Sequence, residues 1–275
     1  MRIYIHTDLE GVMGLGDGSL ISDRDSDSCR QACGWLIDEV NAAARGFFAA
    51  GATEVMALDS HGGGGNLTEE GLDDRVKLED NSKQIWWGSL DETWDATCFI
   101  GAHALSGTPK AFLEHTQSSR DWYRYFVDGR ETGELGQWAA CAGEFGVPMI
   151  FATGDEAACA EARDFFDPVV TVATKTASGR MKAECLPVEE AAAKVEEGAK
   201  RSVELIGRAK PFVIPKPATI RWEFCRCAPA DNAEGLEGVT RVGAREVEKV
   251  VTSAHYAVVP GLLRSQEPPA EKKGS

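Results

Sequence analysis

The segment Arg2-Ile-Tyr-Ile-His-Thr7, followed at once by Asp8-Leu-Glu-Gly11, is the most informative stretch of this chain. Its apolar residues predict a short buried strand. From Ser28 to Ala50 apolar residues recur at helical spacing, and Gly51 suits the end of a helix. A second apolar run, Glu54-Val-Met-Ala-Leu58, comes next. Strand, helix and strand in this order predict a β-α-β unit and therefore a parallel sheet.

Acids and histidines follow the ends of three predicted strands. Asp8 and Glu10 come after the first, His61 after the second, and His103 after the third, which is the apolar run Thr97-Cys-Phe-Ile-Gly101. In open α/β sheets, ligands bind at the carboxyl ends of the strands. Asp8 and Glu10 share one side of an extended chain, where two carboxylates repel unless a cation sits between them. Carboxylates and imidazoles suit zinc in a hydrolytic site.

Each of these residues also has a structural explanation. The two acids after the first strand could be a helix cap and a solvated acid, and His103 could be a satisfied core residue. Glu134 stands at a predicted helix start, where a carboxylate is ordinary capping chemistry. His115 has no strand end beside it, and its local sequence is typical of an exposed loop or helix. We assign His6 and His255 structural roles.

The rest of the chain continues the alternation of strands and helices. The polar segment from Leu67 to Gln84 is predicted to be a loop with a short helix. Further predicted elements are a strand and hairpin turn at Asp121–Gly129, a helix at Gly133–Glu144, a strand at Pro148–Thr153, a helix at Asp155–Phe166, a strand at Val169–Ala173 and a helix from Pro187. We therefore predict an α/β fold with a mainly parallel central sheet flanked by helices.

The composition changes at Lys210–Pro217, where three prolines interrupt the chain. The following segment, Ala218–Phe224, alternates apolar and polar residues as a half-solvated antiparallel strand does. The run from Ala244 to Leu263 is predicted to be a strand followed by a helix. We predict an α/β metal-binding catalytic domain at residues 1–209, a smaller C-terminal α+β domain at 210–265 and a disordered tail at 266–275.

Composition excludes several classes of protein. The chain has 275 residues and a net charge of −15, which argues against a nucleic-acid partner. It shows no signal peptide and no apolar run of about 18 residues, so we expect no membrane association and a cytoplasmic location. The eight cysteines are then expected to be reduced. Neither Cys29 with Cys33 nor Cys225 with Cys227 comes with a second pair at zinc-finger spacing, so a structural zinc–cysteine site is not expected.

Together, these motifs resemble a known family. The order, intervals and neighbouring glycines are similar to those of the D-aminopeptidase family of dinuclear zinc peptidases, peptidase family M55. The resemblance runs through nearly the whole chain and is carried by Asp8-Leu-Glu-Gly11, Asp59-Ser-His61, Gly101-Ala-His103-Ala, His115 and Gly133-Glu-Leu-Gly136. The glycines after His61 differ from the more polar loop of the family, which bears on substrate preference.

The resemblance implies two zinc ions per chain. Asp8 would bridge both ions, Glu10 and His103 would complete the ligands of one, and His61 and Glu134 those of the other. His115 would be the catalytic histidine, either as a nucleophile or as a general base and acid. The family also implies a ring-like homo-oligomer whose sites face an internal chamber, and hence small peptides or aminoacyl amides as substrates.

We therefore expect a zinc-dependent aminopeptidase, selective for D-residues as the resemblance implies. Metal-activated water would attack the substrate with help from His115. One alternative is another metal-dependent amide hydrolase on the same scaffold. The other is a non-catalytic nucleotide-binding module in which Gly62–Gly65 holds a phosphate, although no Lys-Ser/Thr follows these glycines.

Overall fold

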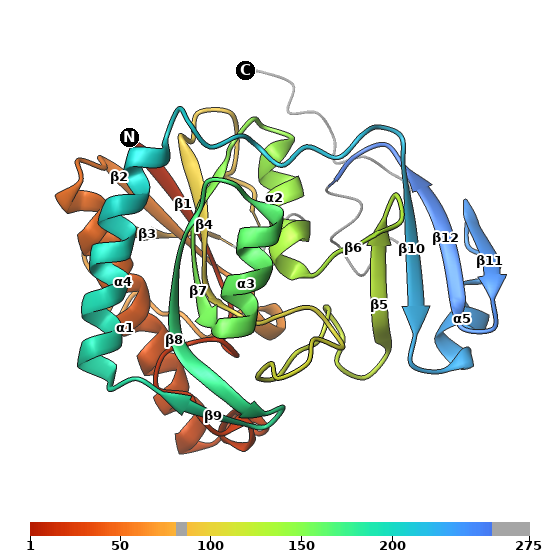
Figure 1. The fold of residues 1–275 in the computed structure, drawn as a ribbon, viewed down its shortest axis with the longest axis horizontal. Coiled ribbons are helices and arrows are strands. Elements are labelled where there is room, and N and C mark those ends of the chain that lie inside the picture. Colours follow the sequence, from red (N-terminus) through yellow and green to blue (C-terminus); the bar gives the residue numbers. More distant parts are fainter. Residues whose placement is uncertain (81–86, 255–275) are drawn as a thin grey trace.

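Two β-sheets form the framework of the described part of the chain, residues 1–80 and 87–254 of a computed structural model (Figure 1). The larger sheet contains β1 (Arg2–Thr7), β2 (Glu54–Asp59), β3 (Val76–Leu78), β4 (Ala96–Ala102), β7 (Met149–Asp155), β8 (Val170–Gly179) and β9 (Lys182–Cys185). Their spatial order is β3-β2-β1-β4-β7-β8-β9. Neighbouring strands from β3 to β8 are parallel, and β9 pairs antiparallel with β8.

Helices cover both faces of this larger sheet. Side chains of β1 alternate between the two faces, as the period of two along a strand requires. Ile3 and Ile5 belong to a core shared with α1 (Asp27–Ala49) and α4 (Val188–Ser202). Tyr4 belongs to a second core, shared with α2 (Glu134–Gly143) and α3 (Glu156–Phe165). Because this parallel sheet is buried on both faces, its strands are continuous apolar runs in the sequence.

The smaller sheet is antiparallel throughout. It contains β5 (Trp122–Val127), β6 (Arg130–Glu131), β10 (Ala218–Phe224), β11 (Val239–Gly243) and β12 (Glu246–Val251), in the spatial order β11-β12-β10-β5-β6. Tyr125 and Trp222 pack in its core with Ala230 and Ala233 of α5 (Cys227–Ala233). Two of its strands thus come from residues 122–131. The division of the chain into domains after residue 209 stays a prediction.

The predicted α/β class is confirmed, with its mainly parallel sheet and flanking helices. One local prediction was wrong: the polar segment from Leu67 contains β3, which pairs with β2. A three-residue edge strand has too few residues to show a periodic pattern, so its pairing with β2 was not visible in the sequence. β12 matches the strand expected in the run from Ala244, whereas the expected helix and His255 lie outside the described residues.

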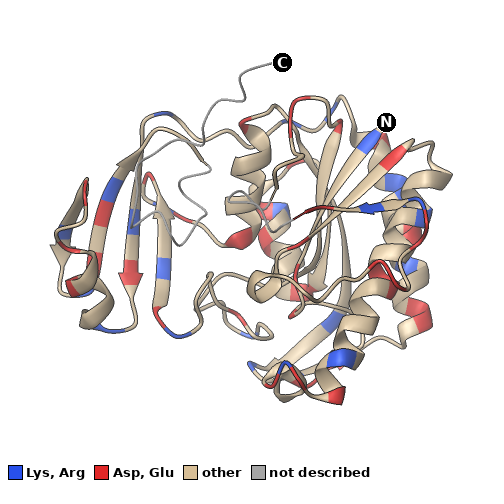
Figure 2. Cartoon of the chain, turned by 180° about the vertical axis from the view of Figure 1, so that it is seen from behind, with Lys and Arg blue, Asp and Glu red and all other residues tan. Residues whose placement is uncertain are grey.

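Within the described residues, three short 3-10 helices lie in connections between the longer elements: η1 (Gly18–Ile21), η2 (His61–Gly63) and η3 (Val203–Leu205). Figure 2 shows Lys and Arg scattered over both sheets and the helices, interspersed with Asp and Glu. All eight cysteines are free thiols. In the described ranges, no helix combines the length and apolar character needed to span a bilayer.

Candidate metal centre

The order β2-β1-β4 brings three strand ends together, as the sequence predicts. The chain leaving β1 runs alongside the end of β4, where Asp8 N donates to Ile100 O at 2.9 Å and Gly11 N to Gly101 O at 2.8 Å. This approach requires glycine, because a Cβ on Gly11 would stand 1.9 Å from Ala102 O. The acids after β1 are thereby held beside the histidine that follows β4.

Asp8 contacts two of the predicted histidines through different oxygens. His61 Nδ1 lies 2.9 Å from Asp8 Oδ1, and His103 Nε2 lies 3.1 Å from Asp8 Oδ2. Asp8 is 4% exposed and His103 3% exposed. A buried carboxylate that divides its oxygens between two imidazoles has the arrangement expected of a bridging ligand.

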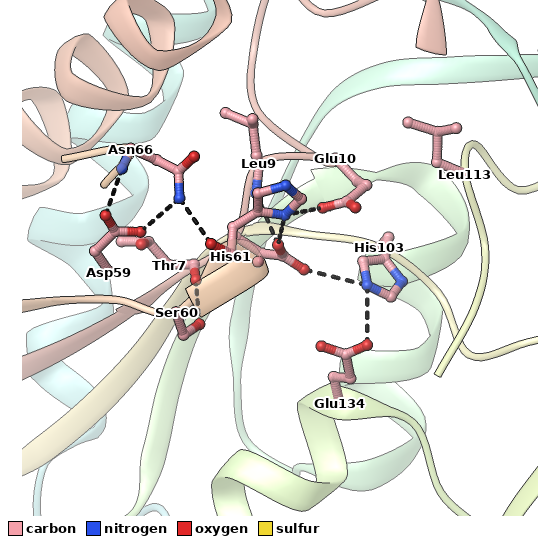
Figure 3. Close-up of polar contacts among 12 residues, drawn as sticks. Thr7, Leu9, Glu10, Asp59, Ser60, His61, Asn66, His103, Leu113 and Glu134 are labelled. Carbon is pink, nitrogen blue, oxygen red and sulfur yellow. Dashed lines mark hydrogen bonds and ion pairs between the residues drawn. The ribbon is translucent and has the colours of Figure 1, made fainter. Parts of the chain in front are cut away.

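Glu10 and Glu134 flank this carboxylate on either side. Glu10 Oε2 lies 2.9 Å from His61 Nδ1, and Glu134 Oε1 lies 3.3 Å from His103 Nε2. Figure 3 shows Glu10 beside His61, and Glu134 reaching His103 from the start of α2. All five predicted metal ligands therefore meet in one cluster at the carboxyl edge of the larger sheet.

His115 also belongs to this cluster, and the surface position suggested by its local sequence was wrong. Its Nε2 lies 3.9 Å from Glu10 Oε1 and 3.8 Å from Glu134 Oε1, and its side chain is 15% exposed. Its Nδ1 is 2.9 Å from Leu113 O, and since a carbonyl only accepts, this nitrogen carries the proton. The hydrogen bond turns Nε2 towards the two carboxylates.

The charged groups of the cluster strongly affect one another's pKa values. Burial disfavours protonated His103, but the carboxylates of Glu134 and Asp8 outweigh burial and hold the His103 pKa well above its ordinary value. Burial would raise the pKa of Asp8, but the adjoining imidazoles of His103 and His61 lower it far below the usual range. Burial likewise opposes ionisation of Glu134, and the nearby His103 nevertheless lowers its pKa to about 2. The ionised carboxylates are therefore stabilised by positive charge beside them, which protonated imidazoles or bound metal ions can supply.

The donor atoms fit a metal centre. In the described ranges, two groups place possible ligand atoms within 4.8 Å of one another: Asp8, Glu10 and His103, and His103, His115 and Glu134. Glu10 Oε2 and His103 Nε2, which belong to residues of the first group, are buried, and their contacts with His61 and Asp8 are ion pairs without hydrogen-bond geometry. Oxygen and imidazole nitrogen donors are those that zinc prefers. The first group is the set predicted for one ion, and the division of ligands between two ions stays a prediction.

The glycine-rich loop is organised around His61. Asn66 Nδ2 donates to His61 O at 2.8 Å and to Asp59 Oδ1 at 2.9 Å. Asp59 Oδ2 accepts from Asn66 N at 2.6 Å and from Leu67 N at 2.9 Å. On the other side, the guanidinium of Arg24 donates to Gly62 O at 2.8 Å and Gly64 O at 2.7 Å. These contacts hold the loop that carries His61, a role for Asn66 and Arg24 that the sequence analysis missed.

Lys175 is a third residue to which the sequence analysis assigned no role. Its Nζ donates to Glu10 O at 3.0 Å and to Leu15 O at 2.8 Å, and the residue is 2% exposed. Burial lowers the pKa of Lys175 to about 8. A lysine within a buried strand is unusual enough to have signalled this position, but the predicted strand at Val169–Ala173 ended before it.

The comparison with known proteins bears directly on this cluster. The family model of peptidase M55, described as D-aminopeptidase, matches residues 1–259. The chain belongs to peptidase family M55. The family resemblance drawn from the sequence motifs is thereby confirmed.

One sequence comparison and one structural comparison show what this M55 chain is similar to. The D-aminopeptidase of Bacillus subtilis (strain 168) is 29% identical over 242 residues, which cover 86% of each chain. A solved structure, described as the Zn-dependent D-aminopeptidase DppA from Bacillus subtilis, a self-compartmentalizing protease, superposes with a TM-score of 0.88. It is 26% identical, with 94% of each chain covered. The likeness therefore extends over both sheets, not only over the metal centre.

Proposed function

We propose that this M55 chain is a zinc-dependent aminopeptidase that hydrolyses short peptides or aminoacyl amides and prefers D-residues. The observation that carries the proposal is the single cluster of three carboxylates and three imidazoles at the carboxyl edge of the larger sheet. The relatives described as D-aminopeptidases, one of them Zn-dependent, support the metal and the substrate class.

Asp8, Glu10, His61, His103 and Glu134 would hold two zinc ions, with Asp8 shared between them. Zinc in such a site supplies an activated water and polarises the scissile carbonyl. Asp8 is suited to its role because its two oxygens already face different histidines. Lys175 and the backbone of β4 keep the segment that carries Asp8 and Glu10 in place.

His115 would move a proton. Its Nδ1–H is occupied by Leu113 O, so Nε2 is the nitrogen free to exchange a proton with substrate. That nitrogen points at the carboxylates of Glu10 and Glu134, where the reacting amide would bind. We propose that His115 protonates the leaving amine as a general acid.

We further propose that the chain forms a ring-shaped homo-oligomer in the cytoplasm, with its sites facing an internal chamber. The description of DppA as self-compartmentalizing supports assembly. The region from residue 210 onwards would contribute contacts between subunits.

A substrate panel tests the proposed activity. Purified protein should hydrolyse D-aminoacyl amides and D-dipeptides faster than their L-counterparts, and a chelator should abolish this hydrolysis until zinc is restored. Chelator-sensitive cleavage of non-peptide amides, without cleavage of aminoacyl substrates, would identify a different amide hydrolase. Activity that survives complete removal of metal would contradict the proposal.

A further inference from the structure

The turn between β8 and β9 lies against the segment that carries His115. Arg180, at the tip of this hairpin, accepts a hydrogen bond from Leu113 N through its carbonyl oxygen at 2.7 Å. Its guanidinium makes two contacts with Glu114, the residue after Leu113. Nε donates to Glu114 Oε1 at 3.1 Å and Nη2 donates to Glu114 O at 3.4 Å. Arg180 therefore contacts the backbone on both sides of Leu113 and reaches the peptide group that precedes His115.

Leu113 has the backbone conformation that orients the histidine. Its φ is +52°, a left-handed conformation that is unfavourable for a residue with a side chain. In this conformation Leu113 O accepts from His115 Nδ1, which directs Nε2 into the cluster. An unfavourable conformation persists only where its surroundings hold it. The hydrogen bond from Leu113 N to Arg180 O is one such support.

The hairpin is itself anchored on its far side. Gly18 N donates to Met181 O at 3.0 Å and Ala183 N donates to Gly16 O at 2.9 Å, while Lys182 forms an ion pair with Asp17. Its tip is therefore a fixed support rather than a free turn.

Glu114 connects this support to the loop after β4. Its Oε2 accepts from Gly107 N at 2.8 Å while its Oε1 accepts from Arg180. The side chain of Arg180 is 48% exposed and that of Glu114 is 17% exposed. An ion pair whose arginine is about half exposed contributes little to stability. The position of the pair beside His115 thus points to alignment rather than to folding.

We propose that Arg180 is a positioning residue that aligns His115 for proton transfer, acting through Glu114 and the backbone of Leu113. The inference rests on the proposed catalytic role of His115. Because a displacement of about 1 Å at a reacting group can cost about 100-fold in rate, loss of the guanidinium should reduce turnover without reducing metal binding.

The test compares zinc-loaded variants with a dipeptide substrate. Arg180→Ala should lower kcat about 10- to 100-fold and leave KM, zinc content and Tm close to those of the wild type. Arg180→Lys should restore part of the loss, since one ammonium group can reach only one of the two Glu114 oxygens. Glu114→Gln, which keeps the backbone acceptor, should lower kcat less than Arg180→Ala. Glu184→Ala is the matched control on the same hairpin: Glu184 is an exposed residue of β9, so kcat should stay within about twofold of the wild type.

A double-mutant cycle with His115→Ala provides the decisive measurement. If Arg180 acts through His115, Arg180→Ala should cause no further loss in the His115→Ala background. Normal kcat in Arg180→Ala, or a loss that multiplies with that of His115→Ala, would overturn the inference alone. Full turnover by His115→Ala would instead contradict the proposed catalytic role, and the inference with it. If Arg180→Ala does not fold, Arg180→Lys and Glu114→Gln decide by the same criteria.

Discussion

The imidazole rings of His103 and His115 stack face to face, with centroids 4.0 Å apart and planes inclined by 12°. Each ring directs Nδ1 to a backbone carbonyl and Nε2 towards Glu134 Oε1, at 3.3 Å from His103 and 3.8 Å from His115. One carboxylate oxygen thus faces a predicted zinc ligand and the proposed proton donor. The stack fixes the donor ring beside the metal centre while leaving it outside the predicted ligand set.

His115→Ala should keep the fold and the full zinc content but lose about 100-fold or more in kcat, because a positioned acid–base group contributes that much. Metal analysis and steady-state kinetics across pH check the prediction. Arg120→Ala, an exposed position in the same loop, is the control and should behave as the wild type. An active, zinc-loaded His115→Ala enzyme with an unchanged pH–rate profile would show that the histidine has no catalytic role.

Asp8→Ala should remove both zinc ions together, since the oxygens that face His61 and His103 belong to one carboxylate. Metal content after dialysis measures this. His61→Ala serves as the comparison and should weaken the binding of one zinc ion more than that of the other. If Asp8→Ala retains its full metal complement, the bridging assignment is wrong.

Gly11→Ala should destabilise the protein by about 3 kcal/mol, the upper range for overpacking, because the added methyl group would stand 1.9 Å from Ala102 O. The affinity for zinc should also fall, because the close approach of Gly11 to the end of β4 holds Asp8 and Glu10 beside His103. Gly34→Ala is the matched control: Gly34 lies in α1, and a Cβ there meets nothing within 4 Å. Alanine at that helical position should stabilise by about 0.5–1 kcal/mol. Equal unfolding free energies for the two variants in urea titrations would refute the steric explanation.

Glu161 should make stability depend on pH. Burial raises its pKa to about 7, although its carboxylate accepts from Leu105 N at 2.7 Å. The folded state therefore holds a proton that the unfolded state releases near pH 4.5, so this contribution is complete below pH 4.5 and is lost as pH rises through about 7. Between pH 5 and 8, the unfolding free energy of the wild type should fall by up to about 3 kcal/mol more than that of Glu161→Gln. This figure converts the shift in the Glu161 pKa at about 1.4 kcal/mol per pKa unit. Parallel pH dependences of the two proteins would exclude this role.

Light scattering at micromolar concentration checks the proposed assembly. The wild type should have the mass of a large homo-oligomer, and deletion of residues 210–275 should reduce that mass. A monomeric full-length protein would contradict the proposal.

Local pattern was sufficient for β1, β2, β4 and the helices between the parallel strands. A strand buried on both faces must be apolar throughout, and an amphipathic helix must repeat its apolar residues, so both leave a signal within a short window. The polar residues after β1, β2 and β4 could be grouped for the same reason, because adjacent parallel strands end at one edge.

The pairing of strands that are distant along the chain could not be predicted from local sequence patterns. Tyr125 of β5 pairs with Trp222 of β10, so residues 122–131 join a sheet that otherwise comes from the C-terminal region. Nothing in the hairpin sequence specifies a partner so distant along the chain. The backbone N–H and C=O groups at the edge of a strand can pair with any other strand of suitable register.

The placement of His115 required the same kind of information. Its neighbours suggest an exposed loop, and its family resemblance suggested a role without explaining its position. The left-handed backbone at Leu113, the carbonyl of Arg180 and the ring of His103 together direct it into the metal centre. Strand ends and ligand types are consequences of local chemistry, whereas the orientation of this histidine depends on contacts between segments that meet only when the chain has folded.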